Sequence, residues 1–138
     1  MEYLRILNPD KYNVEQGQFT RFAFKNTGGG LSVVAWDCIQ ATGVTVCAHL
    51  RKHFKRYRNV MGDPPVFWRF DIATTFSAAP HTVESDETNG DCHHLVKGID
   101  DETLWKVFEV QPFNNFSVCN NGTVHPATVE EIIALKTD

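Results

Sequence analysis

The chain has 138 residues, of which 42% are hydrophobic and 22% are charged, and its formal net charge is −4. This length and composition are typical of one globular domain and exclude a disordered chain or a coiled coil. The apolar runs are only a few residues long, so we expect a single domain over residues 1–138 with no signal peptide and no membrane-spanning segment.

The elements alternate between strands and helices without a regular repeat. Segments rich in β-branched and aromatic residues predict six strands, at residues 3–7, 19–24, 31–36, 66–72, 81–85 and 92–99. Apolar residues at spacings of three and four predict three helices, over about 44–57, 101–109 and 129–135. We therefore expect the α+β class, with a mixed, mostly antiparallel β-sheet and about three helices packed on one face of it.

Local signals support the helices. Val46 and Leu50 begin an apolar stripe on the first. Asp100 is placed to cap the second, and Thr128 with Glu131 three residues later predicts a capping box on the third. The three tryptophans lie among apolar neighbours and are expected to pack in the core: Trp36, Trp68 and Trp105.

Asn89-Gly90 is the strongest short-range hairpin signal in the chain, because a type I′ turn needs a positive φ angle at both central residues. Centring the turn on these residues places Asp86 opposite His93 and Ser85 opposite His94. Side chains alternate between the faces of a strand, so His93 and His94 are predicted on different faces, each opposite a polar partner.

The hairpin segment concentrates histidine and carboxylate side chains. One histidine would act as a general acid or base, with its pKa set by a neighbouring carboxylate. Water is a more credible nucleophile than Ser85, which is not part of a G-x-S-x-G motif. The candidate catalytic residues are His93, His94, Asp86, Glu84 and His81. The alternative is a solvated hairpin in which Asp86 and His93 merely pair across the strands.

The charge is unevenly distributed along the chain. Residues 1–60 contain nine Lys or Arg and four Asp or Glu, so their formal net charge is +5. Residues 61–138 contain four Lys or Arg and thirteen Asp or Glu, so their formal net charge is −9. The end of the first predicted helix holds five cations that predict a phosphate-binding surface: Arg51, Lys52, Lys55, Arg56 and Arg58. The alternative is that these cations offset the helix dipole and bind no ligand.

The four cysteines include no C-x-x-C pair, which favours reduced thiols and a cytoplasmic location. Two N-x-S/T triplets, at 115–117 and 121–123, would matter only in a secreted chain. A zinc site from Cys92, His94, His49 and His53 would need a strand and a helix to converge. The sequence therefore assigns no metal and no other cofactor.

Two hypotheses for the function remain, and whether the chain is an enzyme is open. The first is a small enzyme of the hydrolase or transferase type that acts on a phosphate-bearing nucleotide or nucleic acid. The second is a non-catalytic protein–protein interaction domain of a two-component module, whose charged surfaces dock a protein partner. A more distant third is a small-ligand receptor with an aromatic pocket. If the candidate catalytic residues converge in one cleft, the enzyme hypothesis is favoured. If their positions are scattered, the interaction domain is favoured.

Overall fold

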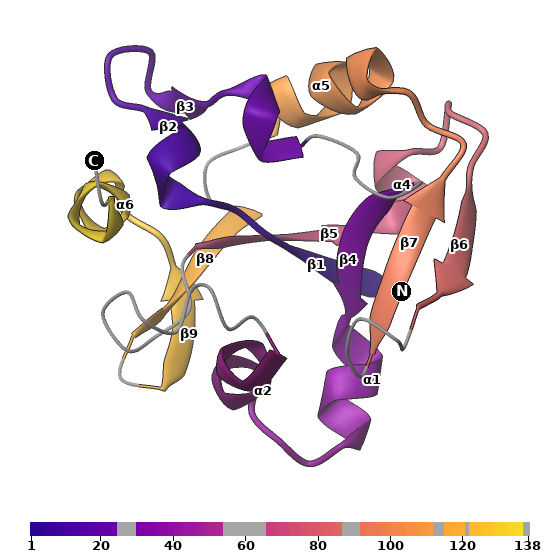
Figure 1. Ribbon diagram of the computed structural model, residues 1–138, viewed down its shortest axis with the longest axis horizontal. Coiled ribbons are helices and arrows are strands. Elements are labelled where there is room, and N and C mark those ends of the chain that lie inside the picture. The colour runs from indigo at the N-terminus through magenta and orange to yellow at the C-terminus, as the bar shows by residue number, and fades with distance from the viewer. Residues whose placement is uncertain (25–29, 54–65, 87–91, 112–114, 121, 137–138) are drawn as a thin grey trace.

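The computed structural model describes residues 1–24, 30–53, 66–86, 92–111, 115–120 and 122–136. Its centre is a seven-stranded sheet in the order β6-β7-β4-β1-β5-β8-β9 (Figure 1). Every pairing between described strands is antiparallel. The strands are β1 (Glu2–Ile6), β4 (Leu31–Ala35), β5 (Phe67–Asp71), β6 (Thr82–Ser85), β7 (His93–Lys97), β8 (Phe116–Asn120) and β9 (Thr123–Pro126). A separate small hairpin pairs β2 (Tyr12–Asn13) with β3 (Gln18–Phe19).

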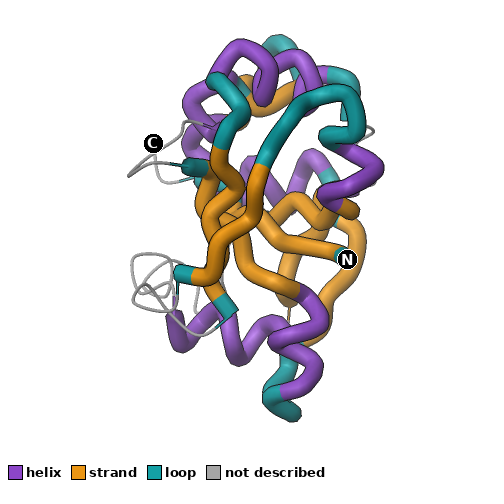
Figure 2. The backbone as a smooth tube through the Cα atoms, turned by 90° about the vertical axis from the view of Figure 1, so that its right-hand side faces the viewer, coloured by secondary structure: helices purple, strands orange, loops and turns teal. Residues whose placement is uncertain are grey.

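Helices lie on both sides of the seven-stranded sheet (Figure 2). The α-helices are α1 (Trp36–Ala41), α2 (Val46–His53), α4 (Ile72–Thr75), α5 (Asp101–Glu109) and α6 (Val129–Leu135). Two short 3-10 turns are η1 (Pro9–Lys11) and η2 (Arg21–Phe24). The fold is therefore α+β with a mostly antiparallel sheet, as expected. The helices cover both faces rather than one, because each face of the sheet is apolar.

The strand register shows which residues share a face. Tyr3 lies opposite Ala35 and Phe70, whereas the next residue, Leu4, lies opposite Val34 and Arg69. Tyr3 belongs to a core that includes Val33, Trp68, Leu104 and Phe108 of α5, and Ile132 of α6. We call this side the α5–α6 face. Leu4 belongs to a second core, with Val34, Phe67, Ile39 of α1, and Val46 and Leu50 of α2. This is the α1–α2 face.

The predicted helix starts are confirmed by their caps. The Asp100 carboxylate accepts a hydrogen bond from the Thr103 amide at 2.7 Å, at the start of α5. The Thr128 hydroxyl and the Glu131 carboxylate form the reciprocal capping box at the start of α6. Both helices therefore span the residues that the sequence predicts. The first predicted helix begins two residues late and is described from Val46 to His53, because Val44 and Thr45 are not helical; residues 54–57 of its predicted range lie outside the described residues.

The strand expected over 19–24 is wrong beyond its first residue. The chain leaves β3 at Phe19 and turns through η2, where Phe22 is 67% exposed. A short apolar run has no periodicity that separates a strand from a single helical turn. The strand expected over 31–36 ends one residue early, because Trp36 begins α1.

Trp68 is buried as expected, but the other two tryptophans are only half-buried. The guanidinium group of Arg69 lies 3.8 Å from the centroid of Trp36, and that of Arg21 lies 5.5 Å from Trp105. These two rings therefore pack against the edges of the two cores, and each also contacts an arginine.

The expectation of reduced cysteines is wrong, because all four form disulfides. Cys38 of α1 is joined to Cys92, which directly precedes β7, and Cys47 of α2 is joined to Cys119 of β8. The bonded residues are 54 and 72 positions apart, and the fold brings their Cα atoms to 5.5 and 5.7 Å. Both bonds fasten the α1–α2 layer to the sheet.

Within the described ranges, no helix is long and apolar enough to cross a membrane.

Candidate functional site

The predicted register of the β6–β7 hairpin is confirmed. Ser85 lies opposite His94 and Val83 opposite Val96, and the Asp86 amide donates to the His93 carbonyl at 2.8 Å. Residues 87–91, with the Asn89-Gly90 turn, lie outside the described residues. Because β7 also pairs with β4 on its other side, this hairpin is a part of the sheet rather than a free arm.

The two adjacent histidines are separated by the sheet. His93 lies opposite Val34, which belongs to the core of the α1–α2 face. His94 lies opposite Val33, which belongs to the core of the α5–α6 face. Asp86 therefore accompanies His93 on one face, and Ser85 accompanies His94 on the other.

His93 and Asp86 form a buried histidine–carboxylate pair. His93 Nδ1 lies 3.2 Å from Asp86 Oδ2, and the two side chains are 7% and 18% exposed. The two atoms are at ion-pair distance. Burial lowers the pKa of His93 below its ordinary value, and the Asp86 carboxylate offsets only a part of that effect. The ring is thus neutral at neutral pH.

The stability of the fold is expected to depend on this neutral histidine. Because the pKa of His93 is lowered from 6.5 in the folded state, the unfolded chain takes up a proton at higher pH than the folded chain does. The stabilising contribution is then fully present above the unfolded value and is lost as pH falls through the lowered folded pKa. Urea denaturation at a series of pH values should show the free energy of unfolding falling below pH 6.5, and falling less in His93→Gln. The same pH dependence in both proteins would contradict this role.

His94 has a different environment. Its Nδ1 lies 2.9 Å from the Cys92 carbonyl, and its ring meets Tyr3 edge to face at 5.7 Å between centroids. The carbonyl can only accept, so Nδ1 donates. The pKa of Tyr3 is raised, first by burial and second by the Asp37 carboxylate, so the phenol keeps its proton at neutral pH.

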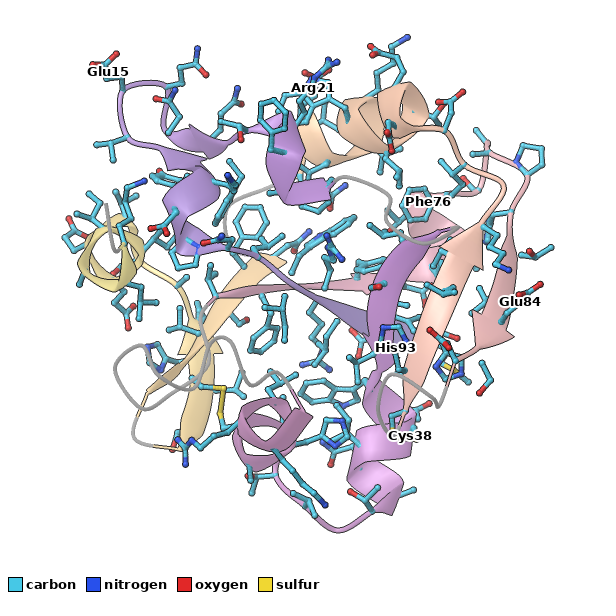
Figure 3. All side chains as sticks on the ribbon, in the orientation of Figure 1. Glu15, Arg21, Cys38, Phe76, Glu84 and His93 are labelled. Atoms are coloured by element: carbon cyan, nitrogen blue, oxygen red, sulfur yellow. A yellow bond between two sulfur atoms is a disulfide. The ribbon has the colours of Figure 1, made fainter. Side chains whose placement is uncertain are left out.

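Glu84 and His81 make contacts of their own and do not join His93. Glu84 forms an exposed ion pair with Lys97 at 2.7 Å. His81 Nδ1 lies 2.8 Å from the Ala79 carbonyl, and its ring contacts Phe76, which belongs to the core of the α5–α6 face. Figure 3 shows Glu84 pointing outward from β6, whereas His93 lies inside, near Cys38. The five candidate catalytic residues thus do not meet in one cleft.

The predicted phosphate-binding cations are described only in part. Arg51 and Lys52 are exposed on α2. Lys55, Arg56 and Arg58 lie outside the described residues. Phosphate binding by this segment stays a prediction.

Of the possible zinc ligands, Cys92, His94 and His49 do not converge, and the side chain of His53 lies outside the described part of the structure. Cys92 is oxidised in the bond to Cys38, so it offers no thiolate. His94 lies on the α5–α6 face, whereas His49 is buried on α2, on the other side of the sheet. Among the residues that the structure describes, no group of three or more His, Cys, Asp or Glu is placed to hold a metal ion.

A further histidine–carboxylate pair, His125 with Glu131, was not predicted from the sequence. His125 Nε2 lies 2.7 Å from Glu131 Oε2, and this contact is the main reason that the pKa of Glu131 is lowered. The other oxygen, Oε1, accepts from the Thr128 amide in the capping box of α6. The pair therefore joins β9 to the start of α6, which is a structural role.

The sequence interpretation also missed a pocket between the β2–β3 hairpin, the end of α5 and β8. Its volume is about 150 Å³. Four aromatic residues, each no more than 6% exposed, contribute to the lining: Tyr12, Phe19, Phe108 and Phe116. The other residues of the lining are Gly17, Gln18, Glu109 and Gln111. Residues from three distant segments make this pocket, so no local motif could have revealed it.

Two exposed valines belong to the segments of the chain that contribute residues to the pocket. Val110, which is 73% exposed, lies between the lining residues Glu109 and Gln111. Val14, which is 51% exposed, belongs to the loop of the β2–β3 hairpin. Glu15 in the same loop points away from the body of the molecule (Figure 3). We call the pocket with Val14 and Val110 the pocket surface.

Comparison of the chain with protein-family models, with curated proteins and with solved structures finds no match.

Proposed function

We propose that this chain is a non-catalytic protein-interaction domain, and that it binds a partner segment which inserts one aromatic side chain, next to a lysine or arginine, into the pocket surface. The observation that supports this most is the partly aromatic pocket, together with two exposed valines in the segments that form it: Val110, between two lining residues in the chain, and Val14, in the β2–β3 loop. Contiguous apolar surface around a concave site is typical of places where proteins bind one another.

The distribution of the candidate catalytic groups supports binding over catalysis. A general acid and a general base must both reach the reacting atoms of one substrate. Here His93 with Asp86 and His94 with Ser85 lie on opposite faces of a sheet that is covered on both sides. The hydrolase or transferase hypothesis would need one of these pairs to work without the other.

The size and shape of the pocket favour a ring. The pocket has a volume of roughly 150 Å³, comparable with that of a cavity that holds benzene, and aromatic and polar side chains share its lining. The rings of Phe19 and Phe116 already meet at an interplanar angle of 65°, as do those of Phe19 and Phe108. An inserted phenyl ring would extend this edge-to-face packing, which aromatic rings prefer.

The polar part of the lining favours a neighbouring cation. Glu109 is the single charged side chain among the described residues of the lining, and it is exposed. Glu15 adds a second carboxylate in the β2–β3 loop, and the chain carries a net charge of −4. A lysine or arginine beside the inserted ring would therefore be attracted both by Glu109 and by the protein as a whole.

The two disulfides favour an oxidising compartment for this interaction. Disulfides persist in secreted and periplasmic proteins and are rare in the cytoplasm. We therefore replace the expected cytoplasmic location by a proposed location outside the cytoplasm. The partner would then be another protein of that compartment, or the part of a protein that is exposed to that compartment.

Selection from a random peptide library tests the proposed function. The disulfide-bonded protein is used as bait, and we expect enriched peptides to share one aromatic residue adjacent to Lys or Arg. The Val110→Asp variant should bind these peptides about tenfold more weakly or worse, because a charge is placed where the partner excludes water. Val44→Asp, at another exposed valine in the connection between α1 and α2, is the matched control and should bind like wild type.

Two outcomes would contradict the proposal. One is the recovery of no common motif from the library, and the other is equal binding by the Val110→Asp and Val44→Asp variants. Glu109→Lys tests the charge separately: it should remove the preference for Lys or Arg, whereas Glu130→Lys, on α6 and outside the lining, should keep it.

A further inference from the structure

The two disulfides differ in how well a reductant can reach them. Cys47 and Cys119 are 1% and 6% exposed and belong to the core of the α1–α2 face. Cys92 is buried, but its partner Cys38 is only partly buried, on the short helix α1. Thiol–disulfide exchange requires a thiolate to reach one of the two sulfur atoms. Of the two disulfides, only Cys38–Cys92 includes a cysteine that is partly exposed to solvent.

The backbone at Cys92 is held in an unfavourable conformation. Its φ angle is +67°, in the left-handed region that residues with a side chain rarely adopt. Among the described residues, every other positive φ angle belongs to a glycine. The disulfide and two hydrogen bonds to the Cys92 carbonyl, from the Ala35 amide and from the His94 ring, hold this conformation. Breaking the disulfide would remove the covalent part of that constraint.

We infer that Cys38–Cys92 is a site of thiol–disulfide exchange with a dithiol reductant, and that its reduction releases the start of β7, while Cys47–Cys119 stays closed. The inference goes beyond the proposed function and does not depend on it.

The reaction proceeds by two exchanges. A thiolate of the dithiol attacks Cys38 Sγ, the bond to Cys92 Sγ breaks, and Cys92 leaves with the electron pair and takes a proton from water. The second thiol of the dithiol loses its proton and attacks the sulfur of the first, which displaces Cys38 as a thiolate. The protein disulfide gains two electrons, and the dithiol becomes a disulfide.

The structural consequence is local. With Cys38 free, Cys92 relaxes from its left-handed conformation, and its carbonyl turns away from the Ala35 amide, which donates to it at 3.0 Å. Ala35 joins β4 to α1, so the change passes from the hairpin to that helix. His93, which pairs with Asp86, directly follows the released residue in the chain, so this pair should also become less constrained.

Timed alkylation tests the exchange. The native protein is treated with dithiothreitol, quenched with an alkylating agent and analysed by mass spectrometry of its peptides. We expect Cys38 and Cys92 to be labelled about tenfold faster or more than Cys47 and Cys119. Equal rates for the two pairs, as expected if reduction waits for global unfolding, would overturn the inference.

Hydrogen exchange of two paired variants tests the consequence. In Cys38→Ala/Cys92→Ala, protection of the Ala35 amide should fall about tenfold or more, because alanine disfavours a positive φ angle. In Cys38→Ala/Cys92→Gly it should be largely retained, because glycine adopts that angle without a steric penalty. The Ala127 amide, which donates to Phe116 in another part of the sheet, is the internal control. Unchanged protection of Ala35 in the first variant would show that the bond does not hold this region.

Discussion

Replacing Cys47 and Cys119 together with alanine is expected to lower the free energy of unfolding by about 4 kcal/mol. The bond joins residues that are 72 positions apart, so it restricts a long segment of the unfolded chain. For a chain of this length the midpoint of thermal unfolding should fall by roughly 10–20 °C. Urea denaturation and calorimetry without reductant measure both quantities.

The second disulfide provides the control for this prediction. It joins residues 54 positions apart, so the same argument gives a similar loss for Cys38→Ala/Cys92→Ala. That loss should be smaller, because the variant no longer has to hold residue 92 in the left-handed conformation. A loss below about 1 kcal/mol in Cys47→Ala/Cys119→Ala would show that the bond does not constrain the unfolded chain as argued.

Trp68→Ala is expected to lower the free energy of unfolding by about 3–5 kcal/mol. Trp68 is 1% exposed, in the core of the α5–α6 face. Its ring stacks on Phe70 at 4.1 Å and meets Phe24 and Phe108 edge to face at 5.4 and 5.6 Å. Removing it leaves a cavity that these neighbours can close only in part, and urea denaturation measures the cost.

Trp105→Ala is the matched control, because this ring is half-buried between Arg21 and Phe108. It should cost about 1 kcal/mol, the loss of one exposed cation–π contact and some packing. Equal losses for the two tryptophans would contradict the assignment of Trp68 to the centre of the core.

The hairpin and the caps could be predicted because their determinants are local. A two-residue turn at Asn89-Gly90 predicts the register of β6 and β7, and the predicted pairing of Ser85 with His94 is the one observed. Asp100 and the pair Thr128 and Glu131 mark helix starts with side chains only three residues from their targets. No distant contact is needed for any of these features.

The last two strands show a local signal that the sequence interpretation overlooked. Asn121-Gly122 is the same dipeptide as Asn89-Gly90, and it connects β8 to β9, in which Asn120 pairs with Thr123. Gly122 has the positive φ angle that such turns require. The flanking residues alternate only weakly, and β9 ends at Pro126, so a search for β-branched runs passes over both strands.

The arrangement of the site could not be predicted, because it depends on contacts between distant segments. Counting residues places His93 and His94 on different faces, but it does not show that α1 and α2 cover one face and α5 the other. The cysteine spacings allow three pairings, and only the fold selects one. The pocket combines β2–β3, α5 and β8, which lie up to about a hundred residues apart.

Nuclear magnetic resonance with a small probe tests the proposed binding surface most directly. The probe is N-acetyl-phenylalanyl-lysine amide, titrated into the isotope-labelled, disulfide-bonded protein. We predict saturable shift changes at the pocket lining and Val110, with nuclear Overhauser contacts from the probe ring to Phe19, Phe108 and Phe116. Saturable changes confined to other parts of the protein, such as α2 with Arg51 and Lys52, or no saturable change at all, would contradict the account.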